Sequence, residues 1–164
     1  MKAKLLIIAN NNIGLGQSGG DTIFLEFIKN WHTKLDITVF GSSETENLLQ
    51  RYHLSPALIK TDHRLSKFSP TVTTLLWHQI RRIFLGKISF LKHIDTFKKS
   101  DYCYTVSDFY PDFIFGLLYK IVNPRGVWLC GQYLFSPHPG SPDSPYRQEP
   151  LKGFLYYLSQ QLTQ

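Results

Sequence analysis

The sharpest chemical signal is a glycine-rich segment, Gly14-Leu15-Gly16-Gln17-Ser18-Gly19-Gly20, between an apolar run at residues 4–9 and a helical pattern from Asp21. Glycines let a backbone approach a ligand closely, and the free amides at the start of a helix favour a phosphate. The spacing differs from a dinucleotide-binding fingerprint, and no acidic residue ends the second predicted strand at Phe40. The segment predicts a phosphate contact, and a plain tight turn is the alternative.

A second signal, Ser107-Asp108, follows an apolar strand pattern at residues 102–106 and precedes a helical pattern from Pro111. Ligands of open α/β sheets bind outside the carboxyl ends of the strands, so both side chains are candidate ligand contacts, and Asp108 is a candidate catalytic residue. The alternative is that Ser107 or Asp108 only caps the following helix.

The third signal is a long irregular segment, residues 133–150, which contains five prolines. Loops of this length commonly carry function, so Tyr133 and His138 are candidates to line an acceptor pocket, with His138 as a candidate general base. A solvated loop histidine is the alternative. The other histidines lack metal-ligand spacing with cysteines or carboxylates, and we expect no metal site.

Strand and helix patterns alternate along the whole chain, and they place these residues in loops after strands. This order predicts an α/β fold with a doubly wound, parallel, Rossmann-like sheet. The predicted strands are 4–9, 37–40, 57–60, 102–106 and 127–131, and the predicted helices are 21–31, 43–52, 70–99, 111–122 and 151–162. Gly86 is a plausible break in the fourth helix, and Cys103 and Cys130 are expected to be buried, reduced thiols.

Composition and length fit one folded domain. The chain has 164 residues, of which 43% are hydrophobic and 18% charged, which excludes an intrinsically disordered protein. The first apolar run is too short for a signal peptide, and no run is long enough to span a membrane. We therefore expect a cytoplasmic protein.

The basic residues gather in one segment. Residues 70–100 hold six lysines and arginines against Asp95 alone, a net charge of +5 within a chain of +6. A local basic helix favours an anionic membrane surface over nucleic acid, and we expect Arg81, Arg82, Lys92 and Lys99 to face that membrane. The alternative is that the apolar stripe of this helix packs on the sheet while its cations are solvated. The stripe comprises Leu76, Ile80, Ile83, Phe84, Ile88, Leu91 and Ile94.

Two segments resemble the amino-terminal domain of family-four retaining glycosyltransferases, which have the GT-B fold. SGGDTIFLEFIKNW after KLLIIANNN is similar to the Gly-Gly loop and first helix of that family, and YTVSDFYPDFIFGLLYKIVNPRGVWLCGQYLFSPHP to its later strand, helix and strand. The chain differs from the family in carrying Gly19-Gly20-Asp21-Thr22-Ile23 in place of Gly-Gly-Ala-Glu-Arg. It also has Ser107-Asp108 where a histidine is common.

The resemblance implies a domain that binds the acceptor, while a carboxyl-terminal domain, in cis or in trans, binds most of a nucleotide-sugar. It implies donor diphosphate contacts at Gly19 and Gly20 and acceptor contacts at Asp21, Ser107, Asp108, Tyr133 and His138. The sugar would pass to a glycan or a lipid-linked acceptor with retention, without a cofactor. Residues 1–150 would form the acceptor domain, residues 151–164 would begin the helix toward the missing second domain, and this chain alone would be inactive.

Two other functions stay open. One is a non-catalytic Rossmann-like subunit that recruits a catalytic partner to a membrane surface. The other is a small nucleotide-cofactor binder, which the missing acidic residue after the second strand disfavours.

Overall fold

A computed structural model describes residues 2–12, 18–63, 71–132, 138, 140–142, 144, 146 and 148–161. The chain divides into two compact units, Met1–Gly131 and Gln132–Gln164. The strands of the first unit are β1 (Ala3–Ala9), β2 (Leu35–Gly41), β3 (Ala57–Lys60), β4 (Tyr102–Thr105) and β5 (Val127–Cys130). Its helices are α1 (Gly19–Trp31), α2 (Ser43–Arg51), α3 (Val72–Lys92), α4 (Ile94–Lys99) and α5 (Tyr110–Val122), and the second unit holds α6 (Pro150–Gln161).

The five strands form one sheet in the order β3-β2-β1-β4-β5, and all neighbouring strands are parallel. The chain moves outward from β1 through β2 to β3, then crosses to the other side of β1 for β4 and β5. The order of the strands therefore switches direction between β1 and β4, as in Rossmann-like folds. The α/β class and the parallel sheet that the sequence predicts are confirmed.

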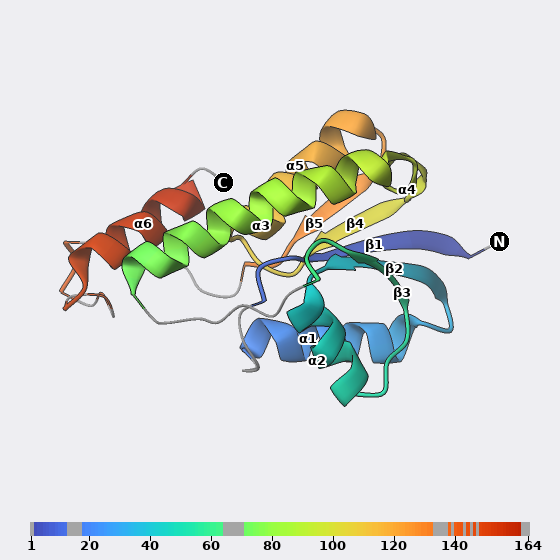
Figure 1. The fold of residues 1–164 in the computed structure, drawn as a ribbon, viewed down its shortest axis with the longest axis horizontal. Helices are drawn as coiled ribbons and strands as arrows, with labels where there is room; N and C mark the ends of the chain where they lie inside the picture. Colours follow the sequence, from blue (N-terminus) through green and yellow to red (C-terminus); the bar gives the residue numbers. More distant parts are fainter. Residues whose placement is uncertain are drawn as a thin grey trace. The chain divides into compact units, whose positions relative to one another are not determined.

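Helices cover both faces of the sheet, with α1 and α2 in one layer and α3, α4 and α5 in the other (Figure 1). Leu5, Ile7 and Ala9 of β1 pack with the α1 and α2 layer, whereas Leu6 and Ile8 pack with the other layer. All five side chains are buried. Because β1 is covered on both faces, it reads in the sequence as one continuous apolar run.

Polar residues fix where the first helices begin. Ser18 caps α1 by accepting a hydrogen bond from the Asp21 amide, while the Asp21 carboxylate accepts one from the Ser18 amide at 2.7 Å. Ser42 precedes α2, and its amide donates to Thr45 Oγ1 at 3.2 Å. Reciprocal caps of this kind satisfy amides that the first helical turn leaves unpaired.

The predicted segment 70–99 does contain two helices, α3 and α4, but they are divided at His93, and a break at Gly86 is wrong because α3 continues through it to Lys92. Gly86 is buried, and a Cβ atom there would overlap the Phe115 ring of α5 and lie 3.1 Å from Asn10 Nδ2. The glycine allows α3 and α5 to approach closely, and this packing outweighs the helical cost of about 1 kcal/mol for glycine.

We expect Gly86→Ala to lower the free energy of unfolding by about 1–3 kcal/mol, because the added methyl group overlaps the Phe115 ring. Urea denaturation measures the change. In a protein that already carries Phe115→Leu, Gly86→Ala should lower the free energy of unfolding by less than it does in the parent, because the smaller side chain leaves room for the methyl group. A stabilised Gly86→Ala variant would instead mean that helical propensity dominates at this position.

The alternative in which the apolar stripe of residues 70–99 packs on the sheet is wrong for most members of the stripe. Leu76, Ile80, Phe84, Ile88 and Leu91 are exposed, whereas His78 and Arg82 on the opposite side of α3 are buried. The reason is electrostatic, since buried carboxylates at the edge of the sheet pair with Arg82.

The two cysteines differ in burial, although both thiols are free. Cys103 lies in β4 and is buried as predicted, whereas Cys130 is exposed. Its predicted burial is wrong because β5 is at the end of the sheet and has a strand neighbour on one side only. None of the described helices is long and apolar enough to cross a membrane.

Candidate functional site

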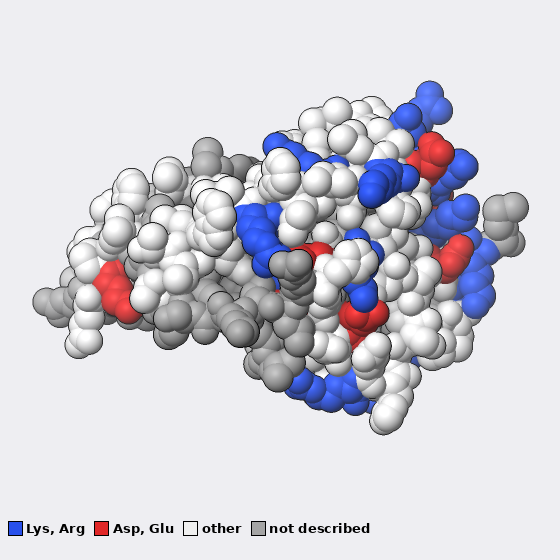
Figure 2. All heavy atoms as spheres, in the orientation of Figure 1, with Lys and Arg blue, Asp and Glu red and all other residues white. Residues whose placement is uncertain are grey.

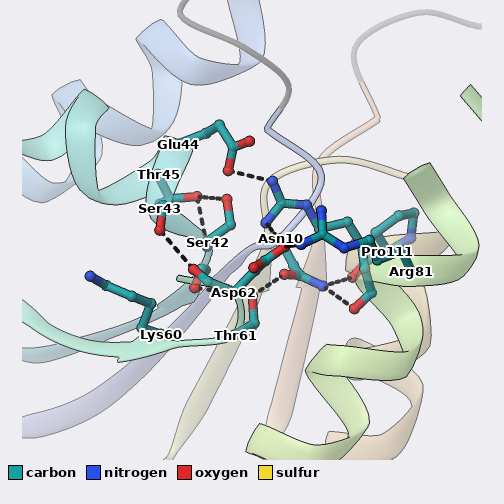
Figure 3. Close-up of polar contacts among 12 residues, drawn as sticks. Asn10, Ser42, Ser43, Glu44, Thr45, Lys60, Thr61, Asp62, Arg81 and Pro111 are labelled. Carbon is teal, nitrogen blue, oxygen red and sulfur yellow. Dashed lines mark hydrogen bonds and ion pairs between the residues drawn. The ribbon is translucent and has the colours of Figure 1, made fainter. Parts of the chain in front are cut away.

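Polar residues follow each of the first three strands and meet at the carboxyl edge of the sheet. Asn10 follows β1, Ser42 follows β2, and Thr61 and Asp62 follow β3. All four are buried. Figure 3 shows them together with Glu44 and Thr45 of α2, Arg81 of α3 and Pro111 of α5. This is the edge at which open α/β sheets bind ligands.

Asn10 is the centre of the cluster and is fully buried. Its Oδ1 accepts a hydrogen bond from Thr61 Oγ1 at 2.6 Å, and its Nδ2 donates to the carbonyl oxygens of Arg82 at 3.1 Å and Pro111 at 3.4 Å. One side chain thus joins the ends of β1 and β3 to helices α3 and α5.

A buried ion pair joins α2 to α3. Arg82 Nη2 donates to Glu44 Oε2, and neither side chain has measurable exposure. Asp62 adds a second carboxylate, at 2.8 Å from Arg81 Nη2 and 3.9 Å from Arg82 Nη1. The Asp62 carbonyl oxygen also accepts from the Ser43 amide and hydroxyl, at 3.1 and 2.8 Å. Buried charges require this kind of close pairing.

His78 lies on the same buried side of α3, one turn before Arg82. Burial, and then the positive charge of Arg82, lower the pKa of His78 from 6.5 to about 4. The imidazole is therefore neutral at pH 7.

Asp112 lies at the switch point between β1 and β4, in the first turn of α5, and is almost fully buried. Its Oδ1 accepts from the amides of Asn10 at 2.6 Å and Asn11 at 2.9 Å, while its Oδ2 accepts from Ser107 Oγ at 2.6 Å. Burial raises the pKa of Asp112 from 3.8 to about 7, although these three hydrogen bonds favour the charged form. Asp112 fixes the end of β1, where the chain leaves the sheet for the glycine-rich segment.

The predicted ligand contacts at the start of α1 have distinct environments. Gly19 is exposed, and a Cβ atom there would meet no described atom within 4 Å. Gly20 is half-buried, whereas Asp21 is buried and its carboxylate is held by Ser18. An acceptor that bound Asp21 would have to compete with this cap. Gly14 and Gly16 lie outside the described residues.

Ser107 and Asp108 follow β4 and are both half-buried. The residue at the N-cap position of α5 is Phe109, so the alternative in which Ser107 or Asp108 caps that helix is wrong. Ser107 instead donates to the carboxylate of Asp112. Because Asp112 also accepts from the Asn10 and Asn11 amides, it brings Ser107 close to the end of β1.

His138 belongs to the second compact unit, whereas Ser107 and Asp108 belong to the first. The ring of His138 is exposed and lies edge-on to Tyr157 of α6, with ring centroids 5.3 Å apart. Its Nδ1 accepts a hydrogen bond from the Gly140 amide at 3.2 Å. Tyr133, the other predicted contact in this loop, lies outside the described residues.

The four predicted membrane-facing cations do not share one environment. Arg82 is fully buried and paired with Glu44, so its placement on a membrane-facing surface is wrong. Arg81 is one-third exposed and pairs with Asp62. Lys92 and Lys99 are exposed, as a membrane contact requires.

Sequence reasoning missed Asn10, Glu44, Asp62 and Asp112 as members of a site. A usable signal was present for three of them, because Asn10, Glu44 and Asp62 come within three residues of the ends of apolar strands. These contacts lie within the cluster, so their chemical effect is to hold the strand ends, the starts of α2 and α5 and the middle of α3 in place. Among the described residues, no group of three or more histidines, cysteines and carboxylates is placed to hold a metal ion.

Comparisons of the chain with protein-family models, with curated proteins and with solved structures each found no match.

Proposed function

We propose that this chain is the acceptor-side domain of a GT-B retaining glycosyltransferase, which transfers a sugar from a nucleotide-sugar to a glycan or lipid-linked acceptor. The observation that carries the proposal is the switch in strand order between β1 and β4. The segments after these two strands lead into α1 and α5, and they contain the sequences that resemble the family.

In this proposal the acceptor binds outside the carboxyl ends of β1 and β4, near Ser107 and Asp108. The amides at the exposed start of α1, at Gly19 and Gly20, contact the donor diphosphate. The transition state is stabilised where negative charge develops on that leaving group. A carboxyl-terminal domain, in cis or in trans, supplies the remainder of the donor site.

The proposal places the protein in the cytoplasm, at the surface of a membrane. A second candidate is a non-catalytic subunit that recruits a catalytic partner to that surface. The observation that favours this candidate is the exposed apolar side of α3, which would serve recruitment without any chemistry in this chain.

Nuclear magnetic resonance titration tests whether this chain binds the acceptor while most of the donor site lies in the other domain. The probes are UDP-glucose, GDP-mannose and a set of methyl glycosides, each added to the 164-residue chain. We expect methyl glycosides to shift the amide resonances of Asn11, Ser107 and Asp108, and the nucleotide-sugars to bind more weakly than about 1 mM. Submillimolar donor binding, or the absence of glycoside shifts at the carboxyl edge, would contradict the proposal.

We expect Gly19→Val to abolish weak binding of inorganic pyrophosphate, because the new side chain would cover the amides at the start of α1. The melting curve should stay normal, since a Cβ atom at Gly19 would meet no described atom within 4 Å. Gly140→Val is the matched control, because it adds the same bulk at an exposed glycine of the other unit. If pyrophosphate shifts the amide resonances of Gly19→Val as it shifts those of the parent, the segment is only a tight turn that leads into α1.

A further inference from the structure

Helix α3 has its apolar side toward solvent. Trp77 is 68% exposed, Leu91 67%, Phe84 64% and Ile80 58%, and Leu76 and Ile88 are also exposed. At 100° per residue these six side chains fall on one side of the helix. An exposed apolar side of this extent marks an interaction surface.

The orientation of α3 is fixed by what lies on its other side. Arg82 pairs with Glu44, the Arg82 carbonyl oxygen accepts from Asn10 Nδ2, and Gly86 lies against the Phe115 ring. A rotation that buried the apolar side would leave Glu44 as an unpaired buried charge, which is strongly unfavourable. The apolar side is therefore held outward by the polar cluster.

The charges near the apolar side are mostly positive, although Asp95 of α4 is exposed three residues after Lys92. Helix α3 contains no acidic residue, and Lys87 and Lys92 are exposed. In Figure 2 much of the surface along α3 is uncharged, and lysine, arginine and a few acidic side chains lie on and beside it. Arg81 adds a partly exposed cation, although Asp62 is its partner.

We infer that α3 lies along the surface of an anionic phospholipid bilayer, with its apolar side among the acyl chains and Lys87 and Lys92 at the phosphates. An amphipathic helix with an aromatic apolar side and flanking lysines binds membranes in this way. Its 21 residues extend about 31 Å, parallel to the bilayer plane.

The charges favour a bilayer over a second copy of the chain. A symmetric contact between two copies joins identical surfaces, so it would place the lysines of both copies in one interface to which α3 contributes no carboxylate. Anionic headgroups instead neutralise these lysines, and each neutralised lysine strengthens binding. The inference names the membrane contact of the proposed function, and its test contains no sugar, so the two can fail separately.

The experiment is co-sedimentation of the 164-residue chain with vesicles of phosphatidylserine and phosphatidylcholine, at low and high salt. We expect the parent to bind anionic vesicles at low salt and to ignore pure phosphatidylcholine. Lys87→Glu with Lys92→Glu should weaken binding at least about tenfold, because two attractions become repulsions. Trp77→Ser with Phe84→Ser should weaken it by a similar factor.

The matched control is Lys29→Glu with Lys34→Glu, which makes the same change in net charge on an exposed lysine of α1, in the opposite layer, and on an exposed lysine in the turn that follows α1. It should bind nearly as the parent does. The inference is overturned if the parent ignores anionic vesicles, or if the control loses as much binding as the α3 variant. It is also overturned if the parent is a dimer by sedimentation velocity, and Trp77→Ser with Phe84→Ser yields monomers that still bind vesicles.

Discussion

Arg82→Ala is expected to lower the free energy of unfolding by about 3–5 kcal/mol, since it leaves the fully buried Glu44 carboxylate without its cation. Asp62 also loses one of its two arginine neighbours, although Arg81 stays at 2.8 Å. The effect should exceed that of any exposed lysine substitution, because salt bridges at the surface contribute at most about 1 kcal/mol. Urea denaturation at constant pH measures the change.

The control for this prediction removes both charges. Arg82→Met combined with Glu44→Met keeps the volume approximately and is expected to recover most of the stability that Arg82→Ala loses. A loss below about 1 kcal/mol in Arg82→Ala would contradict the prediction, because it would mean that water reaches Glu44 and replaces the cation.

Asp112→Asn is expected to remove one proton-linked contribution to stability. The folded pKa of about 7 lies above the unfolded value, so the contribution of Asp112 is fully present below about pH 4 and is lost as the pH rises to about 7. From this one group, the free energy of unfolding changes by up to about 1.4 kcal/mol per pH unit. Asparagine keeps the hydrogen bonds, because its Oδ1 accepts from the Asn10 and Asn11 amides and its Nδ2 donates to Ser107 Oγ.

His78 changes the free energy of unfolding with pH in the opposite direction, over a pH range that overlaps that of Asp112. Its folded pKa of about 4 lies below the unfolded value of 6.5, so its contribution is present above pH 6.5 and is lost as the pH falls toward 4. The two contributions cancel between about pH 4 and pH 6.5. Asp112→Asn should therefore lose stability on acidification relative to the parent, whereas His78→Gln should gain stability relative to it.

Free energies of unfolding at pH 4.5, 5.5, 6.5 and 7.5 for the parent and both variants provide the test. Other carboxylates titrate in all three proteins, so differences from the parent isolate the two groups. If the free energies of unfolding of the parent and Asp112→Asn change with pH in parallel, Asp112 is ionised in the folded protein over this whole pH range. Relative to Asp112→Asn, Asp112→Ala is expected to cost about 2–4 kcal/mol at every pH, because neither variant titrates at this position and alanine leaves two buried amides without their acceptor.

The strands and most helix bounds could be predicted because local signals specify them. β1 is one apolar run, and the turn Asn123-Pro124-Arg125-Gly126 separates α5 from β5. Ser18, the N-cap residue of α1, is of a residue type that commonly precedes a helix. These features depend on neighbours in sequence, which a pattern of residue types records directly.

The polar cluster could not be predicted in the same way, because its partners are distant in sequence. Hydrophobic periodicity correctly grouped the apolar residues of α3 but did not decide whether they pack on the sheet or stay exposed. It contains no information that Glu44 and Asp62 need a buried arginine from that helix. Asp112 was missed for a similar reason, since its role appears only once the Asn10 and Asn11 amides are placed beside α5.

The strand order also has a consequence for synthesis of the protein. Strand β1 pairs with β2 across 32 residues, from Ala3 to Leu35, but with β4 across 97 residues, from Leu5 to Tyr102. At about 5–20 residues per second, the ribosome needs several seconds to proceed from the end of β3 to the end of β4. During that interval one edge of β1, whose last five residues are buried in the folded protein, stays unpaired and open to other nascent chains. We expect the β1–β3 half to be the part of the nascent chain that most depends on chaperones.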